Sequence, residues 1–449
     1  MYICTLREEQ LTERKDAAVY EHLDLAPEAL LEHIRPGTKI LVPVAGCEPP
    51  TLLDMLDEHA DQLEDVHVYQ MCTESLRPYQ MGEYPGKLTH HEFFLGGGSR
   101  KGHSNGTSEL YPVNFSMIPE LVRDHIKPDI LIASVSEPDE HGYMSIGLGA
   151  DYSVQFIGKL PIFGEINAKV PHSFGQNQIH ARQMVGATRS DAPVLEVPPL
   201  LPAEGSAEHR IAELIAPEIR DRDCLQLGIG KLPNAILTML KDRKDLGVHT
   251  ELMSDGVMDL VECGAVTGRF KRSNPRQCVA TFIMGTRKLY DWVDRNPVVY
   301  LDAVDRTNDP FLIGQEPNMV SVNATTEVDL LGQAASETVA GRFYSGSGGQ
   351  LDFAIGARRS KGGRGYIVCP SVTRDGTSKI KVKLGPNSPV TTHKNYIDNV
   401  VTEHGIARLR GTDYSTRAQR LIEVAHPDHR EDLYREAREL NIISRLSAK

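Results

Sequence analysis

The sequence has few cysteines, and their spacing suits neither a metal site nor a disulfide framework. There are seven, and none forms a Cys-x-x-Cys pair: Cys4, Cys47, Cys72, Cys224, Cys263, Cys278 and Cys369. Scattered cysteines of odd number are typical of reduced proteins rather than of secreted, disulfide-bonded domains. The histidines also lack a His-Glu-x-x-His pattern. We therefore expect no metal site and a cytoplasmic location.

A long apolar run and an excess of positive charge are also missing. No stretch approaches the ~18 consecutive apolar residues of a membrane helix, and the N-terminus is acidic from Glu8 onward. The formal net charge is −12, which disfavours nucleic acid or an anionic membrane as the main partner. We expect a soluble, unprocessed protein with no nucleic-acid or membrane partner.

The length of the chain predicts two domains. It has 449 residues, of which 40% are hydrophobic, whereas single hydrophobic cores stop growing near ~250 to 300 residues. Residues 191–206, DAPVLEVPPLLPAEGS, contain four prolines and no helical period, as an extended linker does. We place the boundary near residue 200, which gives an N-terminal domain of residues 1–200 and a C-terminal domain of residues 201–449.

A duplication supports this division. Residues 39–57 and 223–241 can be aligned so that six positions match: Leu41, Gly46, Pro49, Leu53, Met55 and Leu56 with Leu225, Gly230, Pro233, Leu237, Met239 and Leu240. Each copy reads as an apolar strand, a glycine turn and an amphipathic helix, the opening of a βαβ unit. The sequence thus predicts two related α/β domains with mostly parallel sheets, flanking helices and an active site in the crevice between them.

Further apolar segments predict buried strands in both domains: 128–135, 160–166, 298–301, 319–322 and 366–369. From Tyr414 onward the chain is predicted to be helical, with one interruption at His426-Pro427.

Glu251 lies in a segment that reads as a strand closed by a turn. The run from Val248 is β-branched and reaches Asp255-Gly256, a pair typical of tight turns. In the first copy, Tyr69 occupies the place of Glu251. A carboxylate fixed near a strand's end can act as a nucleophile in acyl transfer, although most such glutamates are simply solvated or paired.

Three glycine-rich segments suggest phosphate or oxyanion binding. The segment Gly228-Ile229-Gly230-Lys231-Leu232-Pro233 has proline where a dinucleotide fingerprint needs a third glycine, but its helix start suits an anion. Residues 96–102 lack the ending of a nucleotide-binding loop and read as a surface loop. Residues 345–353, with Gly348 and Gly349, lack the spacing of a hydrolase elbow and form a candidate cradle for a substrate.

Basic residues cluster after this cradle: Arg358, Arg359, Lys361, Arg364, Arg374, Lys379, Lys381 and Lys383. In an acidic protein, a local excess of positive charge fits a multiply phosphorylated ligand. A solvated strand edge rich in lysine explains the pattern equally well.

Several ordered blocks carry a resemblance to a known family. They are SVSEPDEHGYMSIG (134–147), GEIN (164–167), LQLGIGKLPNAI (225–236), ELMSDGVMDLVECGAVTG (251–268), NATTEVDLLGQ (323–333), SGSGGQLDFAIGA (345–357), VVTEHGIARLRG (400–411) and AHPDHR (425–430). Over nearly its whole length the chain resembles the acetyl-CoA hydrolase/transferase family, most closely its 4-hydroxybutyrate CoA-transferase branch.

The resemblance implies roles for particular residues. Glu251 would be the nucleophile that becomes a glutamyl-CoA thioester, with Asn308 and Glu403 beside it. Coenzyme A or the thioester oxygen would be held by Gly228, Ile229, Gly230, Lys231 and Leu232, and by the cradle at Gly348 and Gly349. Arg374 stands where relatives usually have a lysine, so it keeps the charge but changes the geometry toward phosphate. Relatives are commonly homodimers or homotetramers.

The expected activity is CoA transfer by ping-pong kinetics. The donor would be acetyl-, butyryl- or succinyl-CoA and the acceptor a small carboxylate such as 4-hydroxybutyrate, with coenzyme A as substrate and no permanently bound cofactor. A second cation within residues 80–120 would favour a dicarboxylate such as itaconate or succinate. The candidate pocket residues there are Tyr84, His90, His91, Phe93, Arg100, Lys101 and His103. An acyl-CoA hydrolase using the same glutamate and a non-catalytic CoA-binding module are the alternatives.

Overall fold

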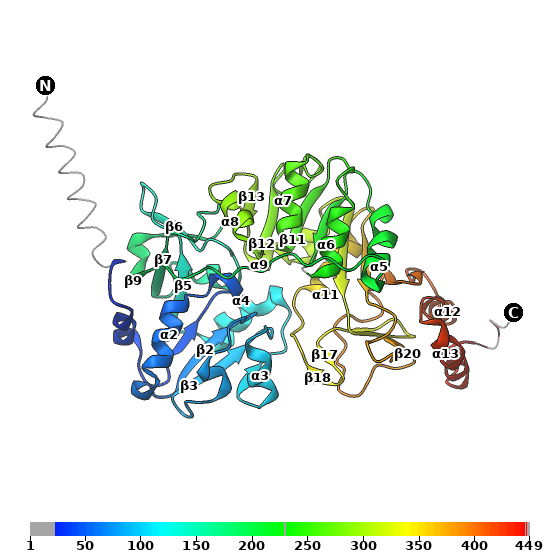
Figure 1. Cartoon of the computed structure of the whole chain (residues 1–449), viewed down its shortest axis with the longest axis horizontal. Coiled ribbons are helices and arrows are strands. Elements are labelled where there is room, and N and C mark those ends of the chain that lie inside the picture. Colours follow the sequence, from blue (N-terminus) through cyan, green and yellow to red (C-terminus); the bar gives the residue numbers. More distant parts are fainter. Residues whose placement is uncertain (1–22, 229, 445, 447–449) are drawn as a thin grey trace, which may run out of the picture.

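The computed structural model of the protein describes residues 23–228, 230–444 and 446, and its two large sheets lie side by side (Figure 1). The N-terminal sheet has seven parallel strands in the order β4-β3-β2-β1-β5-β7-β9. Its strands are β1 (Lys39–Leu41), β2 (Val66–Gln70), β3 (Leu88–Glu92), β4 (Ser108–Leu110), β5 (Ile130–Val135), β7 (Ile162–Asn167) and β9 (Met184–Ser190).

The C-terminal sheet has eight strands in the order β13-β12-β11-β10-β14-β19-β21-β22, of which only the edge strand β22 is antiparallel. Its strands are β10 (Cys224–Leu227), β11 (Gly247–Met253), β12 (Cys278–Ile283), β13 (Val299–Leu301), β14 (Met319–Ala324), β19 (Arg364–Val368), β21 (Asn399–Thr402) and β22 (Gly405–Arg408).

Helices and small sheets complete the two halves. The α-helices are α2 (Pro50–Glu58), α3 (Ser99–Ser104), α4 (Ile118–Leu121), α5 (Ala207–Ile215), α6 (Lys231–Thr238), α7 (Asp255–Glu262), α8 (Arg287–Val293), α9 (Val304–Thr307), α10 (Pro310–Ile313), α11 (Gln350–Arg359), α12 (Tyr414–Glu423) and α13 (Pro427–Glu439). Short 3-10 or π turns are η2 (Pro27–His33), η3 (Ala45–Cys47), η4 (Ala60–Gln62), η5 (Pro78–Met81), η6 (Phe115–Met117), η7 (Val122–Ile126), η8 (Tyr152–Phe156), η9 (Ala181–Gln183) and η10 (Ala216–Glu218). Small sheets pair β6 (Tyr143–Ser145) with β8 (Gln178–His180), β17 (Thr338–Val339) with β18 (Arg342–Phe343), and β15 (Glu327–Asp329) with β16 (Ala334–Ala335) and β20 (Ile380–Lys381).

The two large sheets share one topology. In each, the strand that comes first along the chain (β1 or β10) lies in the interior, the next three are added in sequence on one side, and the fifth (β5 or β14) lies on the other side. This confirms the duplication and the two related α/β domains predicted from the sequence. Strands β2 and β11 are equivalent, but the expected match of Tyr69 with Glu251 is wrong. Leu41 pairs with Tyr69, whereas its counterpart Leu225 pairs with Val248, so Tyr69 corresponds to Val248.

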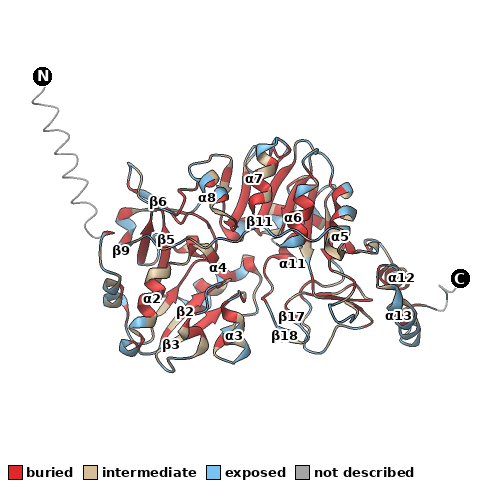
Figure 2. Ribbon diagram, in the orientation of Figure 1, coloured by how far each residue is buried: buried red, intermediate tan, exposed pale blue. Residues whose placement is uncertain are grey.

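The two halves also share a hydrophobic core. Strands β5 and β7 are buried throughout, as parallel strands covered on both faces are, and Figure 2 shows the buried residues concentrated in both sheets. Across the junction, the rings of Phe115 and Phe282 lie 6.0 Å apart. The backbone N–H of Ala150 donates to the carbonyl of Thr281 at 2.7 Å. Such contacts hold the two halves in a fixed relation.

The segment after Glu251 differs from the prediction. Strand β11 ends at Met253, and Asp255-Gly256 begins helix α7 instead of making a tight turn. The Asp255 carboxylate accepts hydrogen bonds from the backbone N–H and the hydroxyl of Thr286, and an acidic residue suits the first turn of a helix. Gly256 serves close packing, since a Cβ there would lie 2.7 Å from Cδ1 of Leu237.

Residues 191–206 contain no helix or strand, in agreement with the predicted linker. The segment is nevertheless docked, because the N–H of Val197 donates to the carbonyl of Gly285 at 2.9 Å. The predicted helical tail is confirmed as α12 and α13, which are interrupted at His426. Within the described residues, no helix has the length and apolar character needed to cross a membrane.

Candidate active site

Glu251 lies in β11 with its carboxylate facing a cavity between the two halves. Oxygen Oε2 accepts a hydrogen bond from Nδ2 of Asn308 at 2.7 Å. Asn308 is fully buried at the end of α9, so the amide is held in place. No arginine, lysine or histidine forms an ion pair with Glu251 in the described part of the chain. This confirms the expected proximity of Asn308 and Glu251.

The surroundings raise the pKa of Glu251 to about 7. The largest cause is burial, which disfavours the charged carboxylate, while hydrogen bonds from Asn308 and the Gly349 backbone oppose the shift. A carboxylate with this pKa is substantially ionised near neutral pH. It also lacks a cation that would lower its reactivity, so it can serve as a nucleophile.

The glycine cradle meets Glu251 directly. A Cβ built on Gly349 would lie 1.9 Å from Oε2 of Glu251 and 2.2 Å from Nδ2 of Asn308, so only glycine fits there. Gly348 has φ +57, a left-handed conformation that glycine adopts without strain. Its carbonyl accepts from the N–H of Phe115 at 3.0 Å. The N-terminal half therefore positions the cradle.

A second carboxylate lies close by, which the sequence analysis did not single out, and it is more deeply buried than the half-buried Glu251. Asp352, in the first turn of α11, is 3% exposed. It accepts from the Ser116 hydroxyl at 3.0 Å and from the Ser116 backbone N–H at 3.4 Å. Burial, followed by the nearby charge of Glu251, raises the pKa of Asp352 to about 7. Its place in the glycine-rich block 345–353 was the one available signal.

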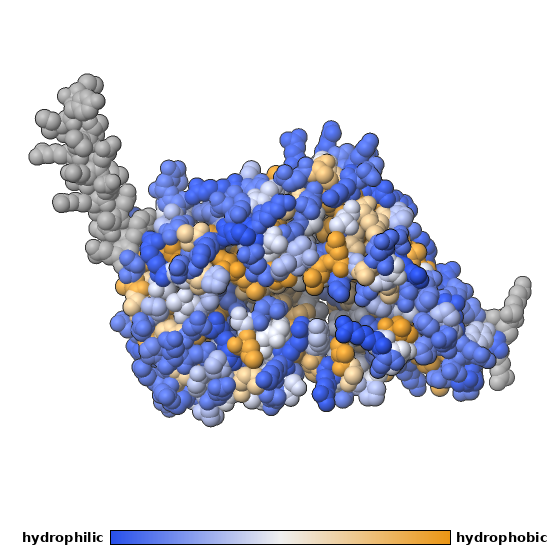
Figure 3. Space-filling view, in the orientation of Figure 1, coloured by the Kyte–Doolittle hydropathy of each residue, from blue (hydrophilic) through white to orange (hydrophobic). Residues whose placement is uncertain are grey.

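The cavity beside Glu251 has a volume of about 230 Å³ and is formed by both halves. The N-terminal half contributes Met71, Cys72, Glu74, Phe94, Leu95, Gly96 and Arg100. The C-terminal half contributes Gln226, Leu227, Gly228, Glu251, Leu252, Phe282, Met284, Asn323 and Gln350. Figure 3 shows apolar side chains along the hollow between the halves. The cavity occupies the crevice predicted from the duplication.

The predicted glycine turn only partly joins this cavity. Gly228 lines it, while Ile229 lies outside the described residues. Gly230 has φ +113 and caps α6, a conformation that favours glycine. Lys231 is exposed and Leu232 is buried. Gly230 lines a neighbouring cavity of about 90 Å³ together with Ser254 and residues 197–200.

Two other predicted site residues lie apart from Glu251. Glu403 accepts from the Ser371 backbone N–H at 2.8 Å. It follows β21, and β10, β14 and β19 separate that strand from β11. Since neighbouring strands are about 4.8 Å apart, Glu403 does not sit beside Glu251 in this chain. Arg374 is exposed in the turn between Val372 and Ser378.

Three of the eight residues in the predicted basic cluster form ion pairs with carboxylates. Arg358 pairs with Asp398, Arg364 with Asp223, and Lys381 with Glu327. Arg358 belongs to α11 and Arg364 to β19, so residues close in sequence point to different partners. Their charges are largely neutralised within the protein.

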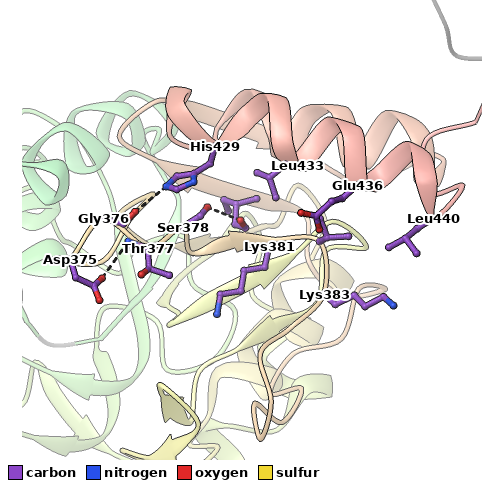
Figure 4. Close-up of a pocket in the computed structure, with 12 residues that line it drawn as sticks. Asp375, Gly376, Thr377, Ser378, Lys381, Lys383, His429, Leu433, Glu436 and Leu440 are labelled. Atoms are coloured by element: carbon purple, nitrogen blue, oxygen red, sulfur yellow. Dashed lines mark hydrogen bonds between the residues drawn. The ribbon is translucent and has the colours of Figure 1, made fainter.

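A larger groove of about 710 Å³ lies between the segment around β20 and helix α13 (Figure 4). Lys381 and Lys383 line one side, and His429, Leu433 and Glu436 line the other. The ring of His429 hydrogen-bonds the Gly376 carbonyl through Nε2 at 2.9 Å. None of the residues that line this groove also lines the Glu251 cavity.

Comparisons with known proteins match two family domains and several relatives to this chain. Residues 9–181 match the family described as the acetyl-CoA hydrolase/transferase N-terminal domain, and residues 285–437 match the corresponding C-terminal domain. The 4-hydroxybutyrate coenzyme A transferase of Clostridium kluyveri is 37% identical over 93% of this chain and 98% of its own. A succinyl-CoA:cyclohexane-1-carboxylate CoA transferase of Geobacter metallireducens is 38% identical over 91% of this chain and 94% of its own.

A solved structure shows the same architecture. RipA from Yersinia pestis superimposes with a TM-score of 0.88 at 33% sequence identity, covering 95% of this chain and 99% of RipA.

Proposed function

The chain belongs to the acetyl-CoA hydrolase/transferase family, and on that premise we propose that Glu251 carries CoA as a covalent thioester during transfer. The enzyme is a CoA-transferase that moves CoA from an acyl-CoA to a small carboxylate such as 4-hydroxybutyrate. The observation that carries the proposal is the Glu251 carboxylate, which Asn308 orients at 2.7 Å in a cavity formed by both halves.

The transfer proceeds through two kinds of covalent intermediate. A carboxylate oxygen of Glu251 attacks the donor thioester carbonyl, the C–S bond breaks, and a mixed anhydride and CoA thiolate result. The thiolate attacks the glutamyl carbonyl, the bond between that carbon and the bridging oxygen of the anhydride breaks, and the acyl group leaves with this oxygen as the first carboxylate product. An acceptor carboxylate then reverses these steps and regenerates Glu251. Atoms and charges balance with coenzyme A as the only shuttled group, which gives ping-pong kinetics.

Each attack places a negative charge on a carbonyl oxygen. The Gly349 N–H already points to the Glu251 carboxylate, so it is placed to stabilise this oxyanion, and we assign further amides to Gly228 and Gly230. One well-placed donor contributes ~3 kcal/mol to such a transition state. The remote part of CoA supplies binding energy that is used at the reacting carbon.

Binding of CoA is assigned to the C-terminal half. Its candidate contacts are Gly228, Ile229, Gly230, Lys231, Leu232, Gly348, Gly349 and Arg374. The N-terminal half, up to a boundary near residue 200, forms the wall of the carboxylate pocket. This is supported by the seven N-terminal residues that line the cavity opposite Glu251.

A cytoplasmic homodimer or homotetramer completes the proposal. The cysteines in the described part of the chain are free, which suits a reducing compartment. Equilibrium sedimentation of the full chain, with Glu251→Gln for comparison, measures the number of subunits with and without acyl-CoA.

Trapping the intermediate tests the function. The enzyme is incubated with acetyl-, butyryl- or succinyl-CoA, digested under acidic conditions and analysed by mass spectrometry, with borohydride reduction in a parallel sample. We expect a CoA adduct on the peptide that contains Glu251, and reduction of that side chain to an alcohol. An adduct on any other residue would refute the assignment.

A hydrolase is separated from a transferase by the acceptor. Thioester loss is measured with and without an added carboxylate, and the new acyl-CoA is identified by chromatography. We expect loss to depend on the carboxylate and to be matched by the new thioester. Equal loss in water alone would indicate hydrolysis by the same glutamate.

A further inference from the structure

The cavity beside Glu251 contains a single cationic residue. The charged side chains that line it are Glu74, Arg100 and Glu251, and the remaining lining residues are uncharged. The amides of Gln226 and Asn323 hydrogen-bond each other in both directions, at 3.1 and 3.0 Å. Gln350 donates to the Thr392 hydroxyl at 3.1 Å. Each of these amides therefore has a partner within the protein, whereas no described residue bonds the terminal nitrogens of Arg100.

Arg100 is held in position without being neutralised. It belongs to α3 in the N-terminal half, and its Nε donates to the carbonyl of Tyr344 in the C-terminal half at 2.7 Å. The guanidinium carbon lies 3.8 Å from the centre of the Tyr344 ring. Among the residues that the structure describes, no carboxylate pairs with Arg100 and no partner bonds its two terminal nitrogens.

We propose that Arg100 binds the distal carboxylate of a dicarboxylate substrate and makes short dicarboxylates the preferred acceptors of this enzyme. The inference rests on the proposed function, because the other carboxylate must be the group that reacts at Glu251. The reacting carboxylate lies at Glu251 in the C-terminal half, and the recognised carboxylate lies at Arg100 in the N-terminal half.

The chemistry of the cavity fits such a molecule. Phe94, Leu95, Phe282 and Met284 supply an apolar wall, against which methylene groups pack. A volume of about 230 Å³ accommodates an acid of a few carbons beside the reacting thioester. A guanidinium presents paired donors that match a carboxylate, and such charged hydrogen bonds are stronger than neutral ones. Stacking on Tyr344 fixes the guanidinium before binding, which lowers the entropy lost on association.

Glu74 opposes this preference from the same cavity. It is exposed, and no described residue forms a hydrogen bond with its carboxylate. The carboxylate lies close to Gly97, because a Cβ added there would be 2.7 Å from Oε2 of Glu74. Its negative charge repels a dianion and limits the affinity for dicarboxylates. The hydroxyl of a hydroxy acid can bond both Glu74 and Arg100, so hydroxy acids should rank between dicarboxylates and simple fatty acids.

The experiment compares acceptors of equal carbon number on the full-length enzyme. With acetyl-CoA as donor, kcat/KM is measured for succinate, 4-hydroxybutyrate and butyrate. For the wild type we expect the order succinate, 4-hydroxybutyrate, butyrate. In Arg100→Met, kcat/KM for succinate should fall about 100-fold, the worth of a charged hydrogen-bonded contact, while butyrate should change by less than about 3-fold. Glu74→Gln should raise the value for succinate.

Arg438→Met is the matched control. Arg438 also stacks over a tyrosine, with its guanidinium carbon 5.0 Å from the centre of the Tyr434 ring, but it lies on α13 and does not line the cavity. It should leave all three acceptors unchanged. The KM for acetyl-CoA is measured in every variant, because an anionic group of CoA is the other possible partner of Arg100.

Each remaining outcome decides against one claim. An equal loss for succinate and butyrate in Arg100→Met, with a raised KM for acetyl-CoA, would assign Arg100 to CoA and overturn the inference. No loss for succinate would overturn it as well. A wild type that uses butyrate but not succinate refutes the inference and leaves the proposed function standing. A wild type that uses no carboxylate refutes the proposed function itself.

Discussion

A Cβ on Gly349 would lie 1.9 Å from Oε2 of Glu251, so the cradle glycine and the carboxylate are in direct contact. The absence of a side chain at Gly349 leaves its backbone N–H free to approach the carboxylate. The same N–H is placed to receive the charge that develops when the glutamyl carbonyl is attacked. The close approach therefore serves both the resting and the reacting forms of Glu251.

Replacement of Gly349 by alanine should remove activity without unfolding the enzyme. Because the methyl group must displace the Glu251 carboxylate or the Asn308 amide, we expect Gly349→Ala to lower kcat/KM at least about 100-fold, the effect of losing one oxyanion donor. Gly264→Ala is the control. Gly264 has φ +80 and no neighbour within 4 Å of the added methyl, so that variant should lose roughly 1 kcal/mol of stability and keep its activity. Equal activity in the two variants would contradict the role of Gly349.

The ionised Glu251 carboxylate should lower the free energy of unfolding of the protein at alkaline pH. The folded-state pKa of Glu251 is raised to about 7 from 4.5, so the folded protein binds this proton more tightly than the unfolded chain. Stability therefore falls as pH rises between these two values, and the loss is complete above 7. We expect Glu251→Gln to be inactive but more stable than the wild type by roughly 1 to 3 kcal/mol at pH 8.5. The gain should shrink toward zero at pH 4.5. Urea unfolding at both pH values measures the free energy of unfolding of the variant and the wild type. If Glu251→Gln were less stable than the wild type at pH 8.5, the raised pKa of Glu251 would not be a source of instability.

The pH dependence of the first half-reaction should follow the same ionisation. Glu251 must be charged to attack, so the rate of thioester formation should rise with pH through about 7. Asp352 has a raised pKa of about 7 in the same region, and two such groups titrate as a pair. Asp352→Asn removes the second charge and should move the midpoint to lower pH. Rapid-quench measurement of the enzyme thioester between pH 5.5 and 8.5 tests this, and a flat profile in the wild type would exclude Glu251 as the titrating group.

Much of the fold could be predicted because its signals are local. Apolar runs such as 130–135 and the aligned strand-turn-helix segments at 39–57 and 223–241 are read from neighbouring residues alone, and both sheets have the topology that the duplication implies. The glycine at 349 and the carboxylate at 251 lie in blocks that carry the family resemblance. The error at Asp255-Gly256 arose because a residue pair typical of turns also suits a helix start, and the contact with Thr286 decides between them.

The rest of the site depends on contacts between distant residues. Ser116 and Asp352 are 236 positions apart, and nothing near either residue indicates the other. The pairing within the basic cluster was hidden for the converse reason, because Arg358 and Arg364 lie six positions apart in sequence but pair with Asp398 and Asp223. Arg100 was among several candidates between residues 80 and 120. Only the position of the cavity distinguishes it from Lys101 and His103, which do not line the cavity.

The contact between Ser116 and Asp352 should influence catalysis across the junction of the two halves. Ser116 donates its hydroxyl to Asp352 at 3.0 Å, and the adjacent Phe115 N–H binds the Gly348 carbonyl at 3.0 Å, so the segment holds the cradle against Glu251. We expect Ser116→Ala to lower kcat about 3- to 10-fold, the effect of one lost hydrogen bond, with the KM for acyl-CoA nearly unchanged. Ser116→Thr, which keeps the hydroxyl, should recover most of the rate. In a double-mutant cycle with Asp352→Ala, the double variant should lose less kcat, in free-energy terms, than the two single variants lose when added together. Additive effects, or no rescue by threonine, would show that Ser116 acts only on stability.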